Sequence, residues 1–145
     1  MNCKLTMTLI SESQEGNCGD DWKYDLEAKV FNEGLKGEGQ ISVPKHLLES
    51  GSVKEPHGSP EPIVLFEGEC HDELLVRLEL TATELDLFIK DVGKASKDLK
   101  IEAPAFGHKK VTKDVDISAG VRESPEILNK NSVFTLRVRF SLTNC

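Results

Sequence analysis

The amino-acid sequence predicts a mainly β protein: a single antiparallel β-sandwich or barrel of about eight strands with one or two short helices. Apolar and polar residues alternate with period two in several segments, as in strands with one buried face. Turn residues separate these segments, and strands and helices do not alternate regularly. The 145 residues suit one domain and contain no long linker, so residues 1–145 are expected to form a single domain. An α+β fold is the alternative.

The strand prediction starts with residues 4–10, where Leu5, Met7 and Leu9 alternate with polar residues. In residues 22–30, Trp22 and Tyr24 fall on the apolar face, which predicts that both belong to the core. Further strands are expected at residues 40–43, 63–66, 74–80, 99–103, 111–117 and 133–142. Loops or turns are expected at residues 11–21, 52–62 and 67–72.

Two short helices are expected between these strands. Residues 44–51 begin with Pro44, which suits a first helical turn, and end with Gly51. Residues 83–92 fit either a strand or a helix, and the helix is favoured because Thr83 can cap it. Apolar residues in this segment recur at helical spacing, at Leu85, Phe88, Ile89 and Val92.

The formal net charge of −7 is unevenly distributed. Residues 11–73 contain 15 acidic and 5 basic side chains, whereas residues 90–145 contain 11 basic and 7 acidic ones. The two segments either pack together and cancel, or form a dipolar surface that attracts another protein or promotes self-association. Nucleic acid is not an expected partner, because the chain is acidic and its basic stretch at 107–110 lacks an aromatic strand face.

The cysteines and the hydropathy pattern favour a cytoplasmic protein. The four cysteines (Cys3, Cys18, Cys70 and Cys145) contain no CxxC pair and no zinc-finger spacing. No apolar run approaches the roughly 20 residues of a membrane span, and the N-terminus does not resemble a signal peptide. Free thiols are therefore expected. A Cys3–Cys145 bridge is the alternative, because terminal strands often lie close together in a sandwich.

The sequence contains no nucleophile elbow, phosphate loop, dinucleotide fingerprint or helical zinc motif. The leading hypothesis is therefore a small non-enzymatic β-sandwich that binds another molecule or protein, without a cofactor. An enzyme with a dispersed site is an alternative, with Cys70, His71 and Asp72 as the candidate group. These thiol, imidazole and carboxylate groups, with the neighbouring glutamates, are also donors that zinc accepts.

A second candidate site is the acidic stretch before the second strand. Carboxylate oxygens are the ligands that calcium prefers, so Glu15, Asp20 and Asp21 are candidate calcium ligands. If the first strands run up and down the sandwich, this loop and the acidic turn at 67–73 lie at opposite ends. Strand parity therefore predicts that the two acidic clusters do not share a site.

The same parity groups loops 11–21, 44–62 and 81–98 at one end. With Asp20 and Asp21 in one loop and Asp91 and Asp98 in another, this arrangement resembles the C2 family of calcium- and membrane-binding sandwiches. The resemblance is topological, spans roughly half of the chain, and implies a calcium-dependent binding domain as an alternative function. The family's last calcium loop has two aspartates separated by one residue, whereas Val92 and Gly93 follow Asp91 here. No functional residue is transferred from the family.

Overall fold

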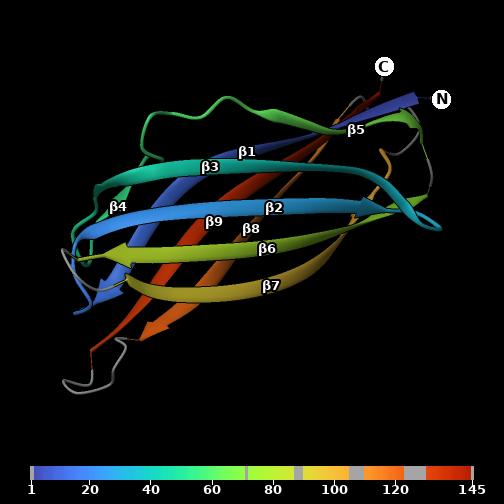
Figure 1. Ribbon diagram of the computed structural model, residues 1–145. Helices are drawn as coiled ribbons and strands as arrows, with labels where there is room; N and C mark the ends of the chain where they lie inside the picture. The colour runs from blue at the N-terminus through green and yellow to red at the C-terminus, as the bar shows by residue number, and fades with distance from the viewer. Residues whose placement is uncertain (1, 71, 87–89, 105–109, 123–129, 145) are drawn as a thin grey trace.

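The computed structural model describes residues 2–70, 72–86, 90–104, 110–122 and 130–144, which form nine strands and no helix. The strands are β1 (Asn2–Gly16), β2 (Asp21–Phe31), β3 (Leu35–Leu47), β4 (Val53–Lys54), β5 (Ile63–Glu69), β6 (Glu73–Leu85), β7 (Lys90–Glu102), β8 (Lys110–Arg122) and β9 (Asn131–Asn144). Figure 1 shows two antiparallel sheets packed face to face. The mainly β sandwich is confirmed. Within the described part of the chain, no helix of membrane-spanning length and hydropathy occurs.

The first sheet has the strand order β4-β1-β9-β8, with β5 also paired to β1. The second sheet has the order β3-β2-β6-β7. β1 and β9 pair along their whole length, from Cys3 opposite Asn144 to Gly16 opposite Ser132. Both ends of the chain therefore lie at the same end of the sandwich (Figure 1).

The core lies between the two sheets and is built from alternate residues of the long strands. Trp22 and Tyr24 are both fully buried, which confirms their predicted core positions. Their rings pack on Phe134 of the opposite sheet, with centroid distances of 5.6 and 5.0 Å. Each fully buried Leu or Phe side chain contributes roughly 1.5–3 kcal/mol, so this apolar layer is the main source of stability.

The two expected helices are wrong where the structure describes them. Residues 44–47 extend β3. Pro44 is accommodated because the register of β3 against β2 shifts between Trp22 and Tyr24, so that Pro44 has no regular pairing partner on β2. Residues 83–85 and 90–92 pair with each other as the ends of β6 and β7, whereas 87–89 lie outside the described residues. Strand pairing overrides the helical spacing of the apolar residues there.

Several strands are longer than the sequence predicts, because polar residues continue them. Most of the expected loop at 11–21 belongs to β1, where Glu12 and Gln14 are buried. The Gln14 side-chain amide donates hydrogen bonds to the carbonyl oxygens of Leu48 (3.0 Å) and Gly19 (3.2 Å). These bonds compensate the NH₂ group for the loss of water, whereas Oε1 of Gln14 accepts no hydrogen bond from the described residues.

Lysines close the seam where β7 and β8, the edge strands of the two sheets, approach each other. Lys97 Nζ donates to the Asp116 carbonyl at 2.7 Å, and Lys113 Nζ donates to the Lys100 carbonyl at 2.9 Å. Charged lysines on exposed edges also discourage pairing with other chains. Part of the basic excess of residues 90–145 therefore protects the edges of the sheets.

Cys3 and Cys70 form a disulfide, with their Cα atoms 5.3 Å apart. The bond ties the start of β1 to the residue that follows β5. The expectation of free thiols is therefore wrong for these two residues, and the alternative Cys3–Cys145 bridge is wrong because Cys70 is the partner of Cys3. Cys18 is buried and does not take part in this disulfide.

Candidate functional site

The connections that strand parity grouped do meet at one end of the sandwich, which we call the loop end. The Leu48 amide donates to the Asp20 carbonyl (2.7 Å), and the Gly51 amide donates to the Gln14 carbonyl (2.9 Å). The Cys18 amide donates to Ser132 Oγ at 3.0 Å. These bonds fix the β1–β2 connection, residues 17–20, against its neighbours.

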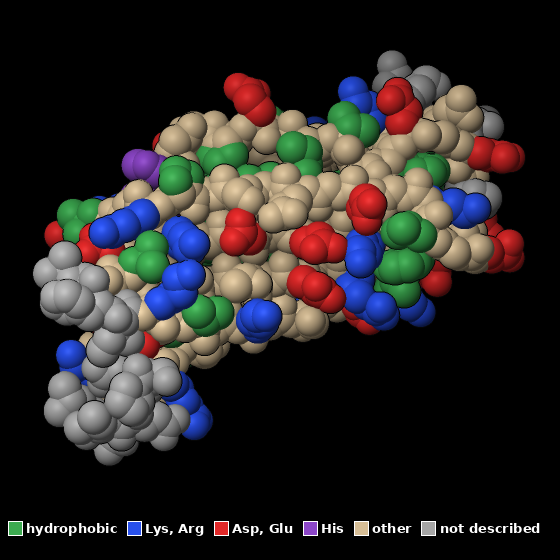
Figure 2. Space-filling model, viewed as in Figure 1, with side chains coloured by type: hydrophobic (Ala, Val, Ile, Leu, Met, Phe, Trp, Pro, Cys, Tyr) green, Lys and Arg blue, Asp and Glu red, His purple; other side chains and the backbone are tan. Residues whose placement is uncertain are grey.

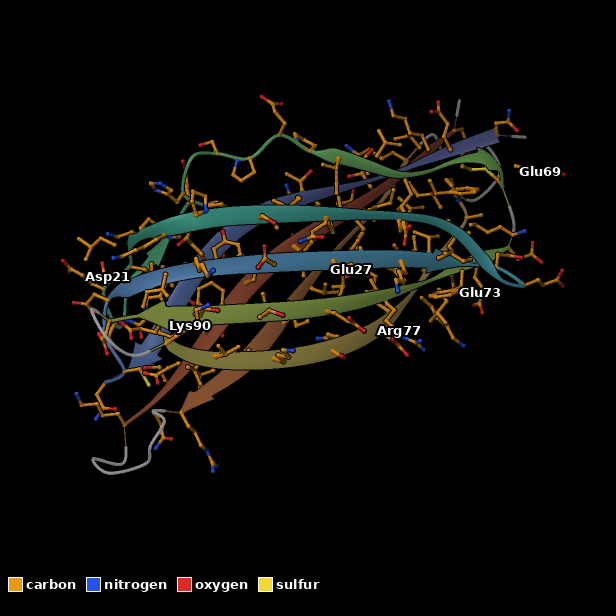
Figure 3. The ribbon with its side chains drawn as sticks, in the orientation of Figure 1. Asp21, Glu27, Glu69, Glu73, Arg77 and Lys90 are labelled. Carbon is orange, nitrogen blue, oxygen red and sulfur yellow. A yellow bond between two sulfur atoms is a disulfide. The ribbon has the colours of Figure 1, made fainter. Side chains whose placement is uncertain are left out.

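The second acidic cluster lies at the other end of the molecule. Figure 3 shows Asp21 at the loop end, and Glu69 and Glu73 at the opposite end. The prediction from parity that the two clusters do not share a site is confirmed for these residues.

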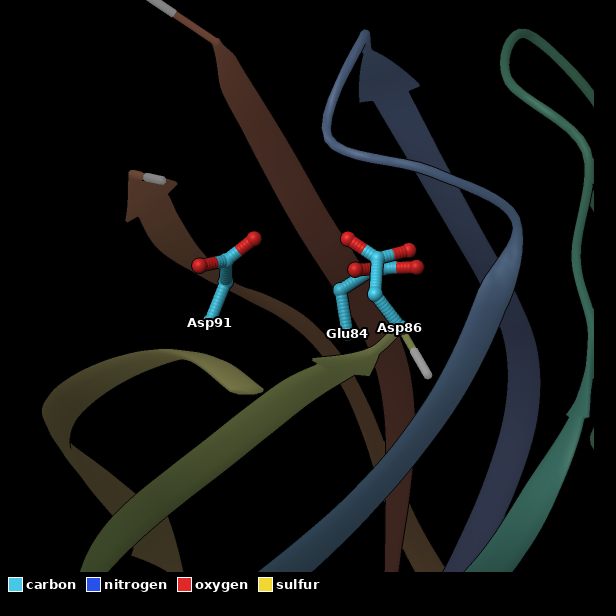
Figure 4. A group of neighbouring side chains, drawn as sticks. All are labelled: Glu84, Asp86 and Asp91. Carbon is cyan, nitrogen blue, oxygen red and sulfur yellow. The ribbon is translucent and has the colours of Figure 1, made fainter. Parts of the chain in front are cut away.

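Three carboxylates converge at the loop end, where β6 ends and β7 begins. Glu84 and Asp91 are direct partners in the β6–β7 ladder, with residue exposures of 0% and 1%. Asp86 follows β6 and is exposed. One carboxylate oxygen from each residue lies within 4.8 Å of the others. In Figure 4 the three side chains project to the same side, with Glu84 and Asp86 adjacent.

The backbone explains why Glu84 points inward. Leu80, Ala82 and Glu84 occupy alternate positions of β6, and all three are buried. Above the carboxylate, the β1–β2 connection passes so closely that a Cβ at position 19 would overlap Glu84 Oε1. Gly19 adopts φ of +141°, a conformation that other residues rarely adopt, and an added Cβ would require the Glu84 carboxylate to move.

The negatively charged form of the Glu84 side chain is electrostatically unfavourable in this position. Neither of its carboxylate oxygens accepts a hydrogen bond of standard geometry from the described residues. Burial, followed by the proximity of Asp86 and the charge of Asp91, raises the pKa of Glu84 to about 7, although the Asp21 amide opposes the shift. An unpaired buried charge costs several kcal/mol, so this carboxylate is stabilised by either a proton or a cation.

The donor set suits a hard divalent cation. Each carboxylate offers two oxygen atoms, and calcium takes 6–8 oxygen ligands that often include water. The group contains no cysteine or histidine, the ligands typical of structural zinc sites. Glu84, Asp86 and Asp91 would hold the ion, and Asp86 is the exposed member of the three.

The calcium ligands predicted from the sequence lie at the same end but outside this group. Glu15 and Asp20 are exposed, whereas Asp21 is half-buried and its amide approaches Glu84. Ligation by Glu15, Asp20 and Asp21 stays a prediction. Sequence reasoning missed Glu84 because its segment was assigned to a helix. The alternation of Leu78, Leu80 and Ala82, continued by two residues, would have placed it on the buried face.

The disulfide alters the candidate site formed by Cys70, His71 and Asp72. The sulfur of Cys70 is bonded to Cys3, so in this form it is not a thiol. His71 lies outside the described residues, and Asp72 is exposed. Catalysis or zinc binding by Cys70, His71 and Asp72 stays a prediction. Of the basic stretch at 107–110, the structure describes only Lys110, the first residue of β8.

The outer faces of the sheets show where the charges lie. In Figure 2 acidic side chains occupy the middle of the β3-β2-β6-β7 face and basic side chains flank them on both sides. On the other sheet, Arg137 and Arg139 form ion pairs with Asp116 (2.9 Å) and Asp114 (2.8 Å). The charges of these two arginines are therefore paired with aspartates of the neighbouring strand.

The candidate site therefore rests on the residues of this chain and their geometry. No protein-family model matches the chain, and no curated protein matches its sequence.

Proposed function

We propose that this protein is a small β-sandwich binding module whose loop end binds a divalent cation of the calcium class through Glu84, Asp86 and Asp91. One observation carries the proposal: Glu84 is completely buried beside two further carboxylates, and neither of its carboxylate oxygens accepts a hydrogen bond of standard geometry from the described residues. The proposal develops the calcium-dependent alternative suggested by the sequence, with a different set of ligands.

A bound cation would offset the repulsion among the three carboxylates and would stabilise the folded state in proportion to its affinity. Trp22 provides a reporter, because it is the only tryptophan and is the strand partner of Glu84. Terbium, which occupies calcium sites, becomes luminescent when a nearby tryptophan transfers excitation energy to it. Displacement of terbium by calcium then measures binding of calcium at this end of the molecule.

The test compares the wild type with Glu84→Gln, which keeps the shape of the side chain and removes its charge. Glu79→Gln is the matched control, because Glu79 lies on the same strand but is exposed on the outer face. We expect calcium at millimolar concentration to displace terbium and raise the Tm of the wild type and of Glu79→Gln. Glu84→Gln should bind at least about tenfold more weakly, the loss of roughly 1.4 kcal/mol.

The absence of calcium binding in the wild type, or equal affinity in Glu84→Gln, would overturn the proposal. A double variant, Asp20→Asn with Asp21→Asn, separates the two ligand sets. If this variant abolishes binding while Glu84→Gln does not, the ligands are those predicted from the sequence and not the buried group.

The uneven distribution of acidic and basic side chains suggests the partner that the module binds besides the cation. Binding of another protein, or self-association between oppositely charged surfaces, is the proposed role, and sedimentation with and without calcium tests self-association. The expected cytoplasmic location remains part of the proposal. The Cys3–Cys70 disulfide argues against this location, because disulfides persist mainly in oxidising compartments. Microscopy of the tagged full chain in its native cell tests the location.

A further inference from the structure

A second buried polar cluster surrounds Glu12, whose residue exposure is 1%. Glu12 Oε1 accepts hydrogen bonds from the Tyr24 hydroxyl (3.2 Å) and the His57 backbone amide (2.6 Å). Glu12 Oε2 contacts Nε2 of His46. The cluster thus joins β1, β2 and β3 to the segment that follows β4.

The geometry places one proton between Glu12 and His46. Nδ1 of His46 lies 2.8 Å from the Pro44 carbonyl oxygen, which can only accept, so Nδ1 carries a hydrogen. The contact between His46 Nε2 and Glu12 Oε2 then needs one further hydrogen, on either atom. Burial and the charge of Glu12 raise the pKa of Tyr24, so its hydroxyl remains a donor.

Residues 53–62, which we call the strap, consist of β4 and the connection from β4 to β5, and they have few buried side chains. Val53 and Lys54 pair with β1, and within residues 53–62 only Pro56 is buried. Besides these contacts, the strap is held by His57, through its amide bond to Glu12 and through its ring. A segment with so few buried contacts opens at a low free-energy cost compared with the core.

The His57 ring stacks on the His46 ring, with a centroid distance of 4.4 Å and an interplanar angle of 3°. With the shared hydrogen on Nε2, His46 is an imidazolium paired with the Glu12 carboxylate, whereas His57 is exposed. A neutral ring stacks favourably on an imidazolium, as other aromatic rings do. A second imidazolium at this distance would be repelled by the first.

We propose that the strap is an acid-operated latch: protonation of His57 places two positive rings face to face, breaks the bond from its amide to Glu12, and releases residues 53–62. Glu12, Tyr24 and His46 are the titratable groups that the strands contribute to this cluster. Lys54 and Glu55 flank His57 on the strap and are exposed. An unperturbed histidine changes its charge between about pH 5 and 8, so the test compares the protein at about pH 7.5 and at about pH 5.

Hydrogen exchange of the His57 amide in the full-length, calcium-free protein tests the latch. In the wild type, the protection factor of this amide, corrected for intrinsic exchange, should fall about tenfold or more between about pH 7.5 and about pH 5. His57→Phe keeps a ring that can stack on an imidazolium but takes up no proton, so its strap should stay protected at both pH values. The Leu78 amide, in the centre of β6, should stay protected in both proteins.

Three results would overturn the proposal. They are equal protection of the His57 amide at both pH values in the wild type, equal loss of strap protection in His57→Phe, and a parallel loss at Leu78, which would indicate global unfolding. The cation site is tested separately: Glu84→Gln should open its strap with acid as the wild type does. Failure of either proposal is therefore distinguishable from failure of the other.

Discussion

Glu84 of β6 and Asp91 of β7 lie directly opposite each other in the second sheet, and both are buried. Like charges at directly opposite positions destabilise a sheet, and burial increases the cost. Because the pKa of Glu84 rises from its ordinary value of 4.5 to about 7, the folded protein binds more protons than the unfolded chain between these values. Stability without a cation therefore falls as the pH rises through this range.

Glu84→Gln should remove that penalty. Without divalent cations at about pH 8, the variant should be more stable than the wild type by up to roughly 3 kcal/mol, the free-energy equivalent of the pKa shift. Near pH 4.5 and below, the two should be similar, because the wild-type carboxyl is then neutral. Urea unfolding at both pH values measures the difference, and a variant less stable than the wild type at about pH 8 would contradict this electrostatic account.

Gly19→Ala should be markedly destabilising, since its methyl group would overlap Glu84 Oε1 in a backbone conformation with φ of +141°. Gly34→Ala is the matched control, with φ of +121° and no atom within 4 Å of the added methyl. We expect a loss of about 1–3 kcal/mol for Gly34→Ala from strain alone, and a larger loss for Gly19→Ala.

A double-mutant cycle isolates the contact with Glu84. In a Glu84→Ala background the carboxylate is absent, so Gly19→Ala should retain only the cost of backbone strain. Urea unfolding of the four proteins provides the cycle. Additive losses would mean that the carboxylate does not lie against Gly19.

The sequence predicted the sandwich because the period-two pattern of residues such as Leu5, Met7 and Leu9 follows directly from one buried face. It failed at the buried polar positions Glu12 and Gln14, because a hydropathy pattern does not reveal hydrogen-bond partners supplied by distant segments. It also failed at Glu84, whose segment was assigned to a helix. Parity placed the loops at the correct end. Which carboxylates meet there depends on the pairing of β6 with β7, and helical spacing in that segment hid the pairing.

Loss of the Cys3–Cys70 bond should destabilise the protein. The bridge closes a loop with a sequence separation of 67 residues, and a loop of this length corresponds to about 4 kcal/mol of restricted unfolded-state entropy. Cys3→Ser with Cys70→Ser should therefore lower the urea midpoint, whereas Cys18→Ala should leave the disulfide intact. Mass spectrometry after alkylation without reduction measures the bond directly. Modification of both Cys3 and Cys70 under these conditions would contradict the disulfide.

Substitution of His46 should lower the stability of the protein more than substitution of its partner Glu12. His46→Ala leaves Glu12 buried without its cationic partner, which costs about 3–5 kcal/mol in comparable pairs. Glu12→Gln can preserve the network, since its carbonyl oxygen can accept from Tyr24 and from the His57 amide. Its NH₂ group can donate to Nε2 of a neutral His46, so the loss should be about 1 kcal/mol.

The double variant His46→Ala with Glu12→Gln tests why the two single substitutions should differ in their loss of stability. If the cost of His46→Ala comes from the charge left on Glu12, then adding Glu12→Gln removes that charge, and the double variant should be more stable than His46→Ala alone. Urea unfolding at about pH 7.5 gives the three differences, and the interaction free energy should lie in the range of roughly 0.5–3 kcal/mol found for contacting residues. Strictly additive losses would instead indicate that His46 acts only by filling space against Tyr24 and His57.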